Sequence, residues 1–363
     1  MLTVKFDKAD DKTALQAKYD AQKIAFAPIV FQATKTLRDL GILDALFDNR
    51  QAGLSALEVA DKLQLPIYGV KVLLEAGLGA EVCRAEEQLY HITKTGYFIL
   101  KDDLTTVNMN FVHDVCYKGM FDLTASITDE KPTGLKVFGT WNTVYEALSS
   151  LPEPVQKSWF DFDHYYSDRS FPEALPLVFA KDVKHLVDVG GNTGKWAIQC
   201  LKYNYDVKVT ILDLPGQLDK AKANLDAEGY SDRVDTMAVN LLEDGDDFPE
   251  NVDAVWMSQF LDCFSLDDIT RILKRARKGM SEKSSLYIME NFWDRQRFEA
   301  AAFSLVYTSL YFTNIANGNS KMYHSDEVKQ CASDVGLRLV NQIDDIGLGH
   351  TLLEYKLADC TTN

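Results

Sequence analysis

The residues with the clearest chemical potential lie in a glycine-rich turn between an apolar strand and a helix. The strand at residues 186–189 leads into Gly190, Gly191 and Gly194, and Lys195 opens the helix. Glycines at such a turn let a ligand approach the backbone closely. A dinucleotide-binding site uses a similar turn, but its glycine spacing is broken at Lys195, which argues against a dinucleotide.

Two aspartates next to this turn favour a nucleoside that carries an amino acid. Asp188 precedes the glycines, where a carboxylate would repel a pyrophosphate but can accept the amino group of S-adenosylmethionine, directly or through water. Asp213, in Asp213-Leu214-Pro215, ends the next strand and can accept both ribose hydroxyls. Taken alone, Asp213 is equally well a turn residue or a helix cap. Together with the glycine turn, the two aspartates predict S-adenosylmethionine as cofactor.

The elements that position these residues follow a regular pattern after Lys184. Apolar strands alternate with helical runs, which favours a parallel sheet covered on both faces and an α/β fold. The last two strands, at residues 337–343 and 351–355, are joined by a loop too short for a crossover helix, so they must pair antiparallel. The other strands are expected at residues 186–189, 209–212, 234–239, 252–257 and 286–289.

The N-terminal part predicts a mainly helical domain with a two-stranded wing. Apolar residues recur every three or four positions over residues 24–47, as in an amphipathic helix. Ser55 with Glu58 forms a capping box before the next helix, and Pro66 opens another. Two short apolar runs flank the polar residues 84–88 and form the wing. This order of three helices and a wing is the winged-helix pattern.

The partner of this winged-helix-like domain is expected to be a second copy of the chain. Residues 67–73, in the position that reads DNA in other winged helices, offer only Lys71 as a cation, and the net charge of -16 would repel a polyanion. We therefore expect a homodimer and no nucleic-acid partner. The alternative of another class is a non-catalytic, ligand-sensing regulator, which would require salt-sensitive DNA binding.

Residues 108–180 are helical in pattern and unusually aromatic. Aromatic side chains mostly serve packing, but a group of them can wall the pocket of an aromatic substrate. Three domains are expected: a dimerisation domain at residues 1–105, a helical linker and substrate-pocket region at 106–180, and an S-adenosylmethionine-binding domain at 181–357. The candidates for the substrate pocket are Trp159, Phe160, Tyr165, Phe303, Tyr307 and Tyr311.

The composition excludes several classes of protein. Hydrophobic residues make up 46% and charged residues 25%, and no stretch approaches the roughly 18 apolar residues of a membrane span. Residues 1–20 lack the apolar core of a secretory signal. The six cysteines are scattered singly, so neither a disulfide nor a metal site is expected, and a reducing cytoplasm fits the chain best.

The motifs as a set resemble those of the plant-type and bacterial small-molecule O-methyltransferases. The likeness covers nearly the whole chain, and it rests on Leu40-Gly41-Ile42-Leu43-Asp44, Asp188-Val189-Gly190-Gly191, Asp213-Leu214-Pro215 and Glu290 at a strand end. It implies a class I methyltransferase Rossmann-like sheet with an antiparallel C-terminal strand. It also implies O-methylation of a hydroxylated aromatic or polyketide-like small molecule.

The same resemblance implies roles for individual residues. Gly190 would contact the methionine end of the cofactor and Asp213 its ribose. Asn240 and Leu241 would contact the adenine. Ser258 takes the place of a lysine that also touches the cofactor in the family.

The chain departs from the family pattern in three places. Asn192 replaces a third glycine, and asparagine tolerates a left-handed backbone better than most residues. The catalytic histidine of the family falls on Asp262, which becomes the candidate base. Glu290 matches a carboxylate that orients the base, whereas a second such carboxylate falls on Met322.

An ordinary aspartate is a weak base for a phenol. A phenol has a pKa near ~10 and an unperturbed aspartate ~3.9, a gap of about six units or roughly 8 kcal/mol. Burial of Asp262 beside Glu290 would raise a carboxyl pKa and narrow this gap, or the proton leaves during methyl transfer. Methylation of a ring carbon ortho to a phenol is an alternative that needs no prior deprotonation. Other candidate bases are His164, His324 and His350.

Overall fold

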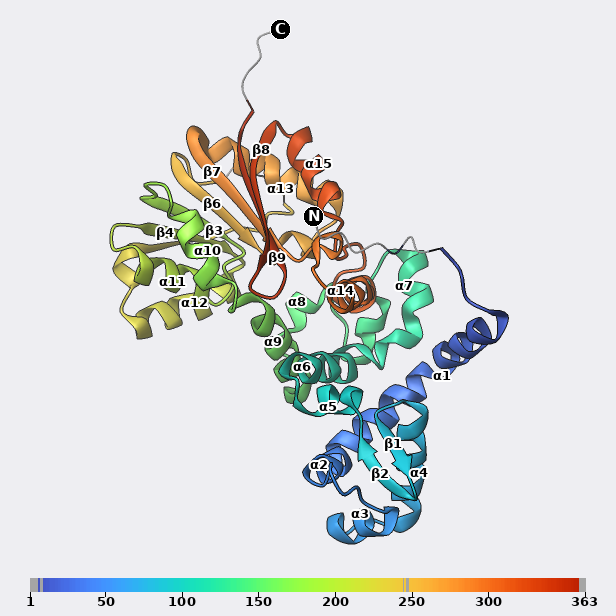
Figure 1. Cartoon of the computed structure of the whole chain (residues 1–363). Coiled ribbons are helices and arrows are strands. Elements are labelled where there is room, and N and C mark those ends of the chain that lie inside the picture. The colour runs from blue at the N-terminus through green and yellow to red at the C-terminus, as the bar shows by residue number, and fades with distance from the viewer. Residues whose placement is uncertain (1–5, 7–8, 244, 246–247, 359–363) are drawn as a thin grey trace. The chain divides into compact units, whose positions relative to one another are not determined.

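The chain forms two compact units, residues 7–113 and residues 114–363, and Phe6 belongs to the second of them (Figure 1). The computed structural model describes residue 6 and residues 9–243, 245 and 248–358. Each unit has a hydrophobic core of its own. The three-part division expected from the sequence stays a prediction. Cys360 lies outside the described residues.

The N-terminal unit has the predicted order of helices followed by a two-stranded wing. Capping boxes at Thr13 and Ser55 begin its first and third helices, and Gly41, with φ 76°, separates the first two. Leu37 and Leu74 are fully buried in its core. The elements are α1 (Ala14–Asp39), α2 (Ile42–Asp48), α3 (Ala56–Leu63), α4 (Ile67–Gly79), β1 (Cys83–Glu86), β2 (Leu89–Ile92), α5 (Lys94–Lys101) and α6 (Asp103–Phe111).

The second unit begins with helices that pack against later parts of the same unit. Ser126 Oγ donates to Asn314 Oδ1 over 2.7 Å in the interior, so residues far apart in sequence share one core. The helices before the sheet are α7 (Leu123–Asp129), α8 (Val144–Ala147), α9 (Glu153–Ser167) and α10 (Phe171–Val178). Those within and after it are α11 (Lys195–Tyr203), α12 (Pro215–Glu228), α13 (Leu266–Gly279), α14 (Glu299–Tyr311) and α15 (Ser325–Asp334).

A seven-stranded sheet organises this unit, in the order β5-β4-β3-β6-β7-β9-β8 (Figure 1). The first five strands in that order are parallel, while β9 runs antiparallel to both β7 and β8. The predicted fold class, a class I sheet with an antiparallel C-terminal pair, is confirmed. The strands are β3 (His185–Val189), β4 (Lys208–Asp213), β5 (Val234–Ala238), β6 (Val252–Ser258), β7 (Met280–Glu290), β8 (Leu337–Ile346) and β9 (His350–Leu357).

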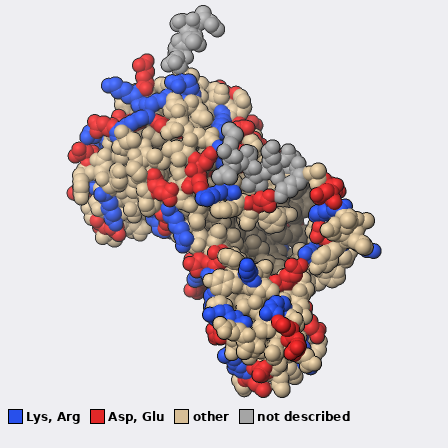
Figure 2. Space-filling view, viewed as in Figure 1, with Lys and Arg blue, Asp and Glu red and all other residues tan. Residues whose placement is uncertain are grey.

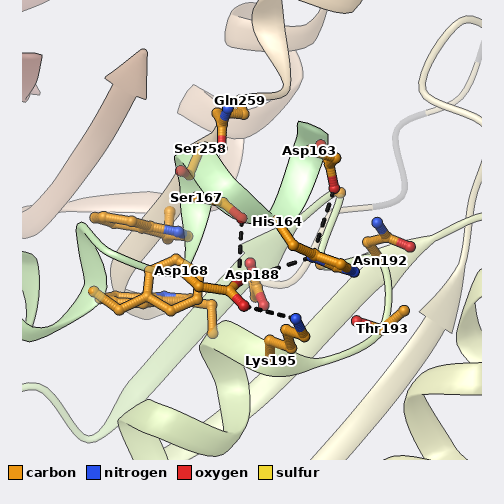
Figure 3. A pocket seen from close by; sticks show the side chains of 15 residues that line it. Asp163, His164, Ser167, Asp168, Asp188, Asn192, Thr193, Lys195, Ser258 and Gln259 are labelled. Carbon is orange, nitrogen blue, oxygen red and sulfur yellow. Dashed lines mark hydrogen bonds and ion pairs between the residues drawn. The ribbon is translucent and has the colours of Figure 1, made fainter. Parts of the chain in front are cut away.

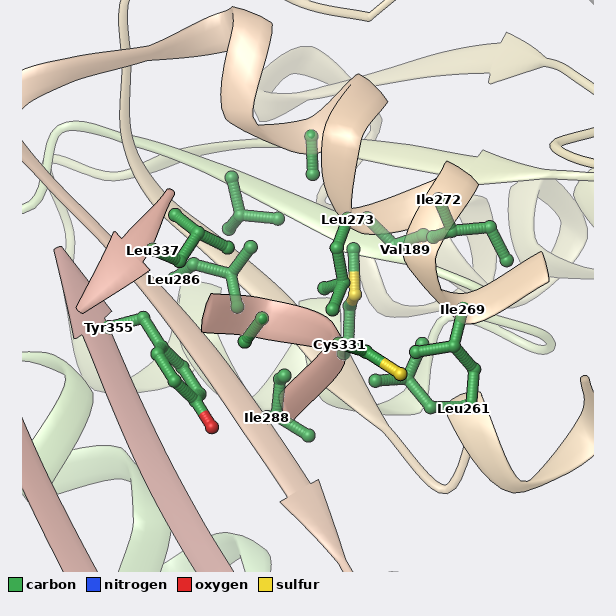
Figure 4. Close-up of a cluster of buried hydrophobic side chains, with 14 of the residues drawn as sticks. Val189, Leu261, Ile269, Ile272, Leu273, Leu286, Ile288, Cys331, Leu337 and Tyr355 are labelled. Carbon is green, nitrogen blue, oxygen red and sulfur yellow. The ribbon is translucent and has the colours of Figure 1, made fainter. Parts of the chain in front are cut away.

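Helices cover both faces of the sheet. Helix α13 packs on one face through a row of apolar side chains (Figure 4). Its buried residues Ile269, Ile272, Leu273 and Ala276 recur at helical spacing on one face. Ser265 caps the helix, acidic residues fill the first turn and basic residues the last, which suits the helix dipole. Each buried Ile or Leu contributes about 1.5–3 kcal/mol. This packing fixes the segment before α13, which carries Asp262.

Several elements are longer than the sequence pattern predicts, among them β7, α1, β8 and β9. Strand β7 begins at Met280 because exposed polar residues continue its backbone ladder before the apolar run at Leu286. Helix α1 begins at Ala14, ten residues before the apolar periodicity at Ile24, because the capping box at Thr13 satisfies its first amides. Apolar periodicity reports burial rather than backbone conformation, so it misses exposed ends.

The surface carries both signs of charge. On the face shown in Figure 2, Asp and Glu side chains lie among Lys and Arg side chains. Within the described ranges, no helix combines the length and apolar character needed to span a membrane. Among the same residues, no cluster of three or more His, Cys, Asp or Glu side chains is arranged to hold a metal ion.

Candidate active site

The glycine turn leaves strand β3 in a conformation that most side chains would resist. Gly190 and Gly194 have φ of 71° and 77°, in the left-handed region that favours glycine. Asn192 has φ 48°, which asparagine tolerates. The Gly190 amide donates to Leu212 O over 2.8 Å, which ties the turn to strand β4. The turn is therefore a fixed element and not a loose loop.

Side chains at two of these glycines would obstruct the turn. A Cβ at Gly190 would lie 2.3 Å from the ring of Phe260, which packs over the turn. A Cβ at Gly191 would lie 2.7 Å from Asp188 Oδ2. Glycine at position 191 therefore avoids a clash with this buried carboxylate oxygen.

Asp188 is a buried carboxyl group with an unused oxygen. Its side chain is 3% exposed, and Oδ2 has no hydrogen-bond partner among the described residues. Burial, with a smaller contribution from Asp213, raises the pKa of Asp188 to about 8. A buried unpaired carboxyl is costly, and a bound ammonium group would compensate that cost.

Asp213 ends strand β4 and holds the glycine turn. Its Oδ2 accepts the Asn192 amide over 2.8 Å, and its Oδ1 accepts the Leu214 amide over 2.7 Å. Burial raises its pKa, while these two amides act in the opposite direction. Asp213 thus has the turn role considered from the sequence. Each oxygen keeps a further lone pair for a ribose hydroxyl.

A cavity of about 90 Å³ opens beside the turn (Figure 3). The predicted cofactor residues in its wall are Asp188, Gly190, Gly191 and Ser258. Helix α9 and the residues after it form the opposite wall. The further lining residues are Asp163, His164, Ser167, Asp168, Phe171, Asn192, Thr193, Lys195, Trp196, Trp256 and Gln259.

The other four predicted cofactor residues, including Asp213, are not among the lining residues. Gly194 caps the start of helix α11. The Asn240 side chain donates to Glu243 Oε1 over 3.0 Å and accepts the Leu242 amide over 3.1 Å. Leu241 is buried in the core of the sheet. The adenine contact of Asn240 and Leu241 stays a prediction.

Glu290 connects the end of strand β7 to the segment that carries Asp262. Its Oε1 accepts the amides of Phe260 and Leu261 over 3.0 and 2.9 Å, so it fixes the backbone directly before Asp262. Its side chain is 3% exposed, and Oε2 has no hydrogen-bond partner in the described part of the chain. Burial and the charge of Asp262 raise the pKa of Glu290 well above its ordinary value.

Asp262 itself is buried and less acidic than an ordinary aspartate. Burial raises its pKa to about 6, and a hydrogen bond from Cys263 Sγ to Oδ1, 3.5 Å long, acts in the opposite direction. The gap to a phenol is therefore about four pKa units instead of six. The structure brings Asp262 and Glu290 together, as expected from the sequence.

The three alternative bases have different surroundings. His164 lines the cavity, and burial and Lys195 lower its pKa, so it is neutral at pH 7. His324 caps helix α15 by accepting the Asp326 amide. His350 is fully buried, its pKa is lowered to about 4, and its Nε2 lies 3.0 Å from Asn291 Nδ2. Only His164 of the three faces the cavity.

The candidate substrate aromatics fall into separate groups, and none lines this cavity. Trp159 Nε1 donates to Tyr311 OH over 2.6 Å, and Phe160 packs edge-on against Trp159. Tyr165 lies under the guanidinium of Arg169. Phe303 and Tyr307 pack on each other and are each 58% exposed. Their assignment to a substrate pocket stays a prediction.

Two parts of the chain match models of known protein families. Residues 122–338 match the model of the O-methyltransferase domain, and residues 18–90 match that of the Dimerisation2-like domain. The chain belongs to the O-methyltransferase domain family. The first match covers more than half of the chain and includes Asp188, Asp213, Asp262 and Glu290.

Curated relatives of this methyltransferase cover most of its length. It is 21% identical over 272 residues to the L-tyrosine C(3)-methyltransferase of Streptomyces lavendulae, covering 74% of this chain and 73% of that protein. It is 24% identical over 295 residues to acetylserotonin O-methyltransferase 1 of Oryza sativa subsp. japonica, covering 75% and 76%. The relatives thus include enzymes named for carbon and for oxygen transfer.

Solved structures share the fold of this methyltransferase. The apo form of the S-adenosylmethionine-dependent methyltransferase SibL matches with a TM-score of 0.71 at 22% identity, covering 93% of this chain and 99% of that one. The O-methyltransferase NcsB1 from neocarzinostatin biosynthesis was solved in complex with S-adenosylmethionine and 2-hydroxy-5-methyl naphthoic acid. It matches with a TM-score of 0.64 at 18% identity, and the match covers 96% of this chain and 99% of that one. At these identities the likeness concerns the fold.

The enzyme is an S-adenosylmethionine-dependent methyltransferase, as the sequence predicted. Its residues fit the cofactor on two observations. The unpaired Asp188 Oδ2 suits the ammonium group, and glycine at position 191 adds no Cβ beside that buried oxygen. Asp213 lies at the same turn with lone pairs for the ribose.

Sequence reasoning missed several polar residues of the cavity of this methyltransferase. Asp163 and Asp168 come from helix α9 and the residue after it, and Lys195 pairs with Asp168. Burial and the charge of Asp262 raise the pKa of Asp163 to about 7. A signal was present, because Asp163, His164, Ser167 and Asp168 recur at helical spacing among the aromatics of α9.

Proposed function

We propose that the enzyme methylates a hydroxyl group of an aromatic or polyketide-like small molecule. The observation that carries this proposal is the buried Asp262, with its raised pKa and with Glu290 fixing the two amides that precede it. Phe260 packs over Gly190 of the glycine turn, and Asp262 lies two residues after Phe260 in the chain. Glu290 accepts hydrogen bonds from the amides of Phe260 and Leu261, so it fixes the backbone between Phe260 and Asp262. Relatives named for aromatic and natural-product substrates support the same class.

The residues of the chain have separate tasks in this reaction. S-adenosylmethionine supplies an electrophilic methyl group on a sulfonium. The glycine turn, Asp188 and Asp213 would hold the cofactor, and the site would hold the acceptor hydroxyl close to its methyl group. The carboxylate of Asp262 would take up the proton that the acceptor hydroxyl loses on methylation. Because the pKa of Asp262 is about 6, it accepts this proton as the oxygen loses electron density.

Carbon methylation is the second candidate function. It is favoured by the aspartate at position 262, since a ring carbon attacks before it loses its proton, and by the tyrosine C(3)-methyltransferase among the relatives. We expect the product of incubation with S-adenosylmethionine and a panel of phenols to carry a methoxy group, seen by proton NMR. An aryl-methyl signal instead would reject oxygen transfer and support carbon transfer.

We also propose that the enzyme is a homodimer formed through its N-terminal unit. Helix α1 exposes large apolar side chains that a monomer would leave in water, among them Leu15, Ile24 and Ile29 at 81%, 76% and 65% exposure. The match of residues 18–90 to a Dimerisation2-like domain supports this. Light scattering should give about twice the chain mass of 40.9 kDa, and Ile24→Glu should shift it toward one chain mass. A wild-type monomer at micromolar concentration would contradict the proposal.

A further inference from the structure

An ion pair at the wall of the cofactor cavity joins two segments that are distant in sequence. Lys195, the first residue of helix α11, places Nζ 2.7 Å from Asp168 Oδ2, just after helix α9 (Figure 3). Their side chains are 41% and 39% exposed. An ion pair this exposed contributes little to stability, so either partner can exchange for a ligand group at small cost.

The other titratable side chains of the cavity wall are three aspartates and one histidine. Asp163, Asp168 and Asp188 all line it, and Lys195 carries the one lysine or arginine charge among its lining residues. The neighbouring His164 is neutral at pH 7 because burial lowers its pKa. Lys195 is therefore the side chain of this wall that can form an ion pair with an entering carboxylate at pH 7.

The amino-acid part of S-adenosylmethionine carries one ammonium and one carboxylate group. The buried, unpaired Asp188 Oδ2 in the same wall suits the ammonium group. We propose that Lys195 binds the carboxylate group of the cofactor, while Asp168 holds the lysine side chain turned toward the cavity before the cofactor arrives. Lys195 is then a cofactor-binding residue and Asp168 a positioning residue.

This inference rests on the proposed placement of the cofactor at the glycine turn, and two ligands separate it from that placement. S-adenosylhomocysteine keeps both charged groups, whereas its decarboxylated analogue, S-adenosyl-3-thiopropylamine, keeps only the amine. Titration calorimetry on the full-length protein should show that Lys195→Met weakens S-adenosylhomocysteine binding about tenfold or more, as expected for a hydrogen bond to a charged group. Binding of the decarboxylated analogue should change less than about twofold.

Two further variants control for indirect effects. Lys202→Met removes a lysine from the same helix that pairs with Glu228 instead, and both affinities should stay as in the wild type. Lys195→Arg should retain most of the affinity for S-adenosylhomocysteine, because it keeps the charge at the same place. Thermal melting of each variant checks that the fold is intact.

Three outcomes would overturn the inference or its basis. Equal weakening of both ligands by Lys195→Met would show a structural role, and unchanged S-adenosylhomocysteine binding would show no role. Either result leaves the proposed function standing. No binding of S-adenosylhomocysteine to the wild type would refute the proposed site itself.

Discussion

Replacing Asp213 with alanine is expected to weaken S-adenosylhomocysteine binding about a hundredfold or more. The substitution removes the acceptors of the Asn192 and Leu214 amides, at 2.8 and 2.7 Å, and with them the proposed contacts to the ribose. Each hydrogen bond to a charged group contributes about 1.5–3 kcal/mol, and two of them correspond to at least about a hundredfold in Kd. Titration calorimetry measures the loss directly.

Two comparisons show whether this loss is specific. Asp219→Ala removes an exposed carboxylate from helix α12, six residues further along the chain, and should leave the affinity unchanged. Asp213→Asn keeps the size of the side chain but has one acceptor oxygen for two amides, so its affinity should fall between those of alanine and the wild type. If Asp213→Ala binds within about threefold of the wild type, Asp213 is a turn residue without a cofactor role.

The sheet and the glycine turn could be predicted because their signals are local. The central strands β3, β4 and β6 are short apolar runs, because a strand that is buried on both faces needs apolar residues at nearly every position. The loop with Gly347 and Gly349 between β8 and β9 leaves no room for a crossover, so the antiparallel pair followed from loop length alone. The capping box at Ser55 is a contact between residues three positions apart and is present as expected.

The cavity wall could not be predicted in the same way because it depends on contacts across the fold. Lys195 is visible in the sequence only as a break in glycine spacing, yet it pairs with Asp168, 27 residues earlier. The surroundings of the aromatic substrate-pocket candidates could not be predicted from the sequence either. Phe303 and Tyr307 share a helix face, but periodicity does not say whether that face meets a pocket or the outside, and each is 58% exposed. Identity of a residue predicts its chemistry, whereas its partners come from tertiary packing.

The second large effect concerns catalysis: Asp262→Asn should lower kcat about a hundredfold while S-adenosylhomocysteine binding stays within about twofold. General base catalysis contributes about 10²–10⁴ in rate, and the amide cannot take up the hydroxyl proton. The Asp262 side chain is buried, and asparagine has nearly the same size as aspartate, so the variant should keep the fold. Single-turnover rates with a phenol that the product analysis identifies as a substrate measure the effect without product release.

The pH dependence gives this prediction a second, independent readout. Burial raises the pKa of Asp262 to about 6, and only the deprotonated carboxylate acts as a base, so the wild-type rate should rise with pH through about 6 and then level off. In Asp262→Asn this rise should disappear, whereas Asp267→Asn, an exposed acid in the first turn of α13, should retain it. A wild-type rate that is flat from pH 5 to 8, or an asparagine variant with full turnover, would mean that the proton goes directly to solvent. Methyl transfer would then depend on alignment with the sulfonium alone, which is the situation that also favours attack by a ring carbon.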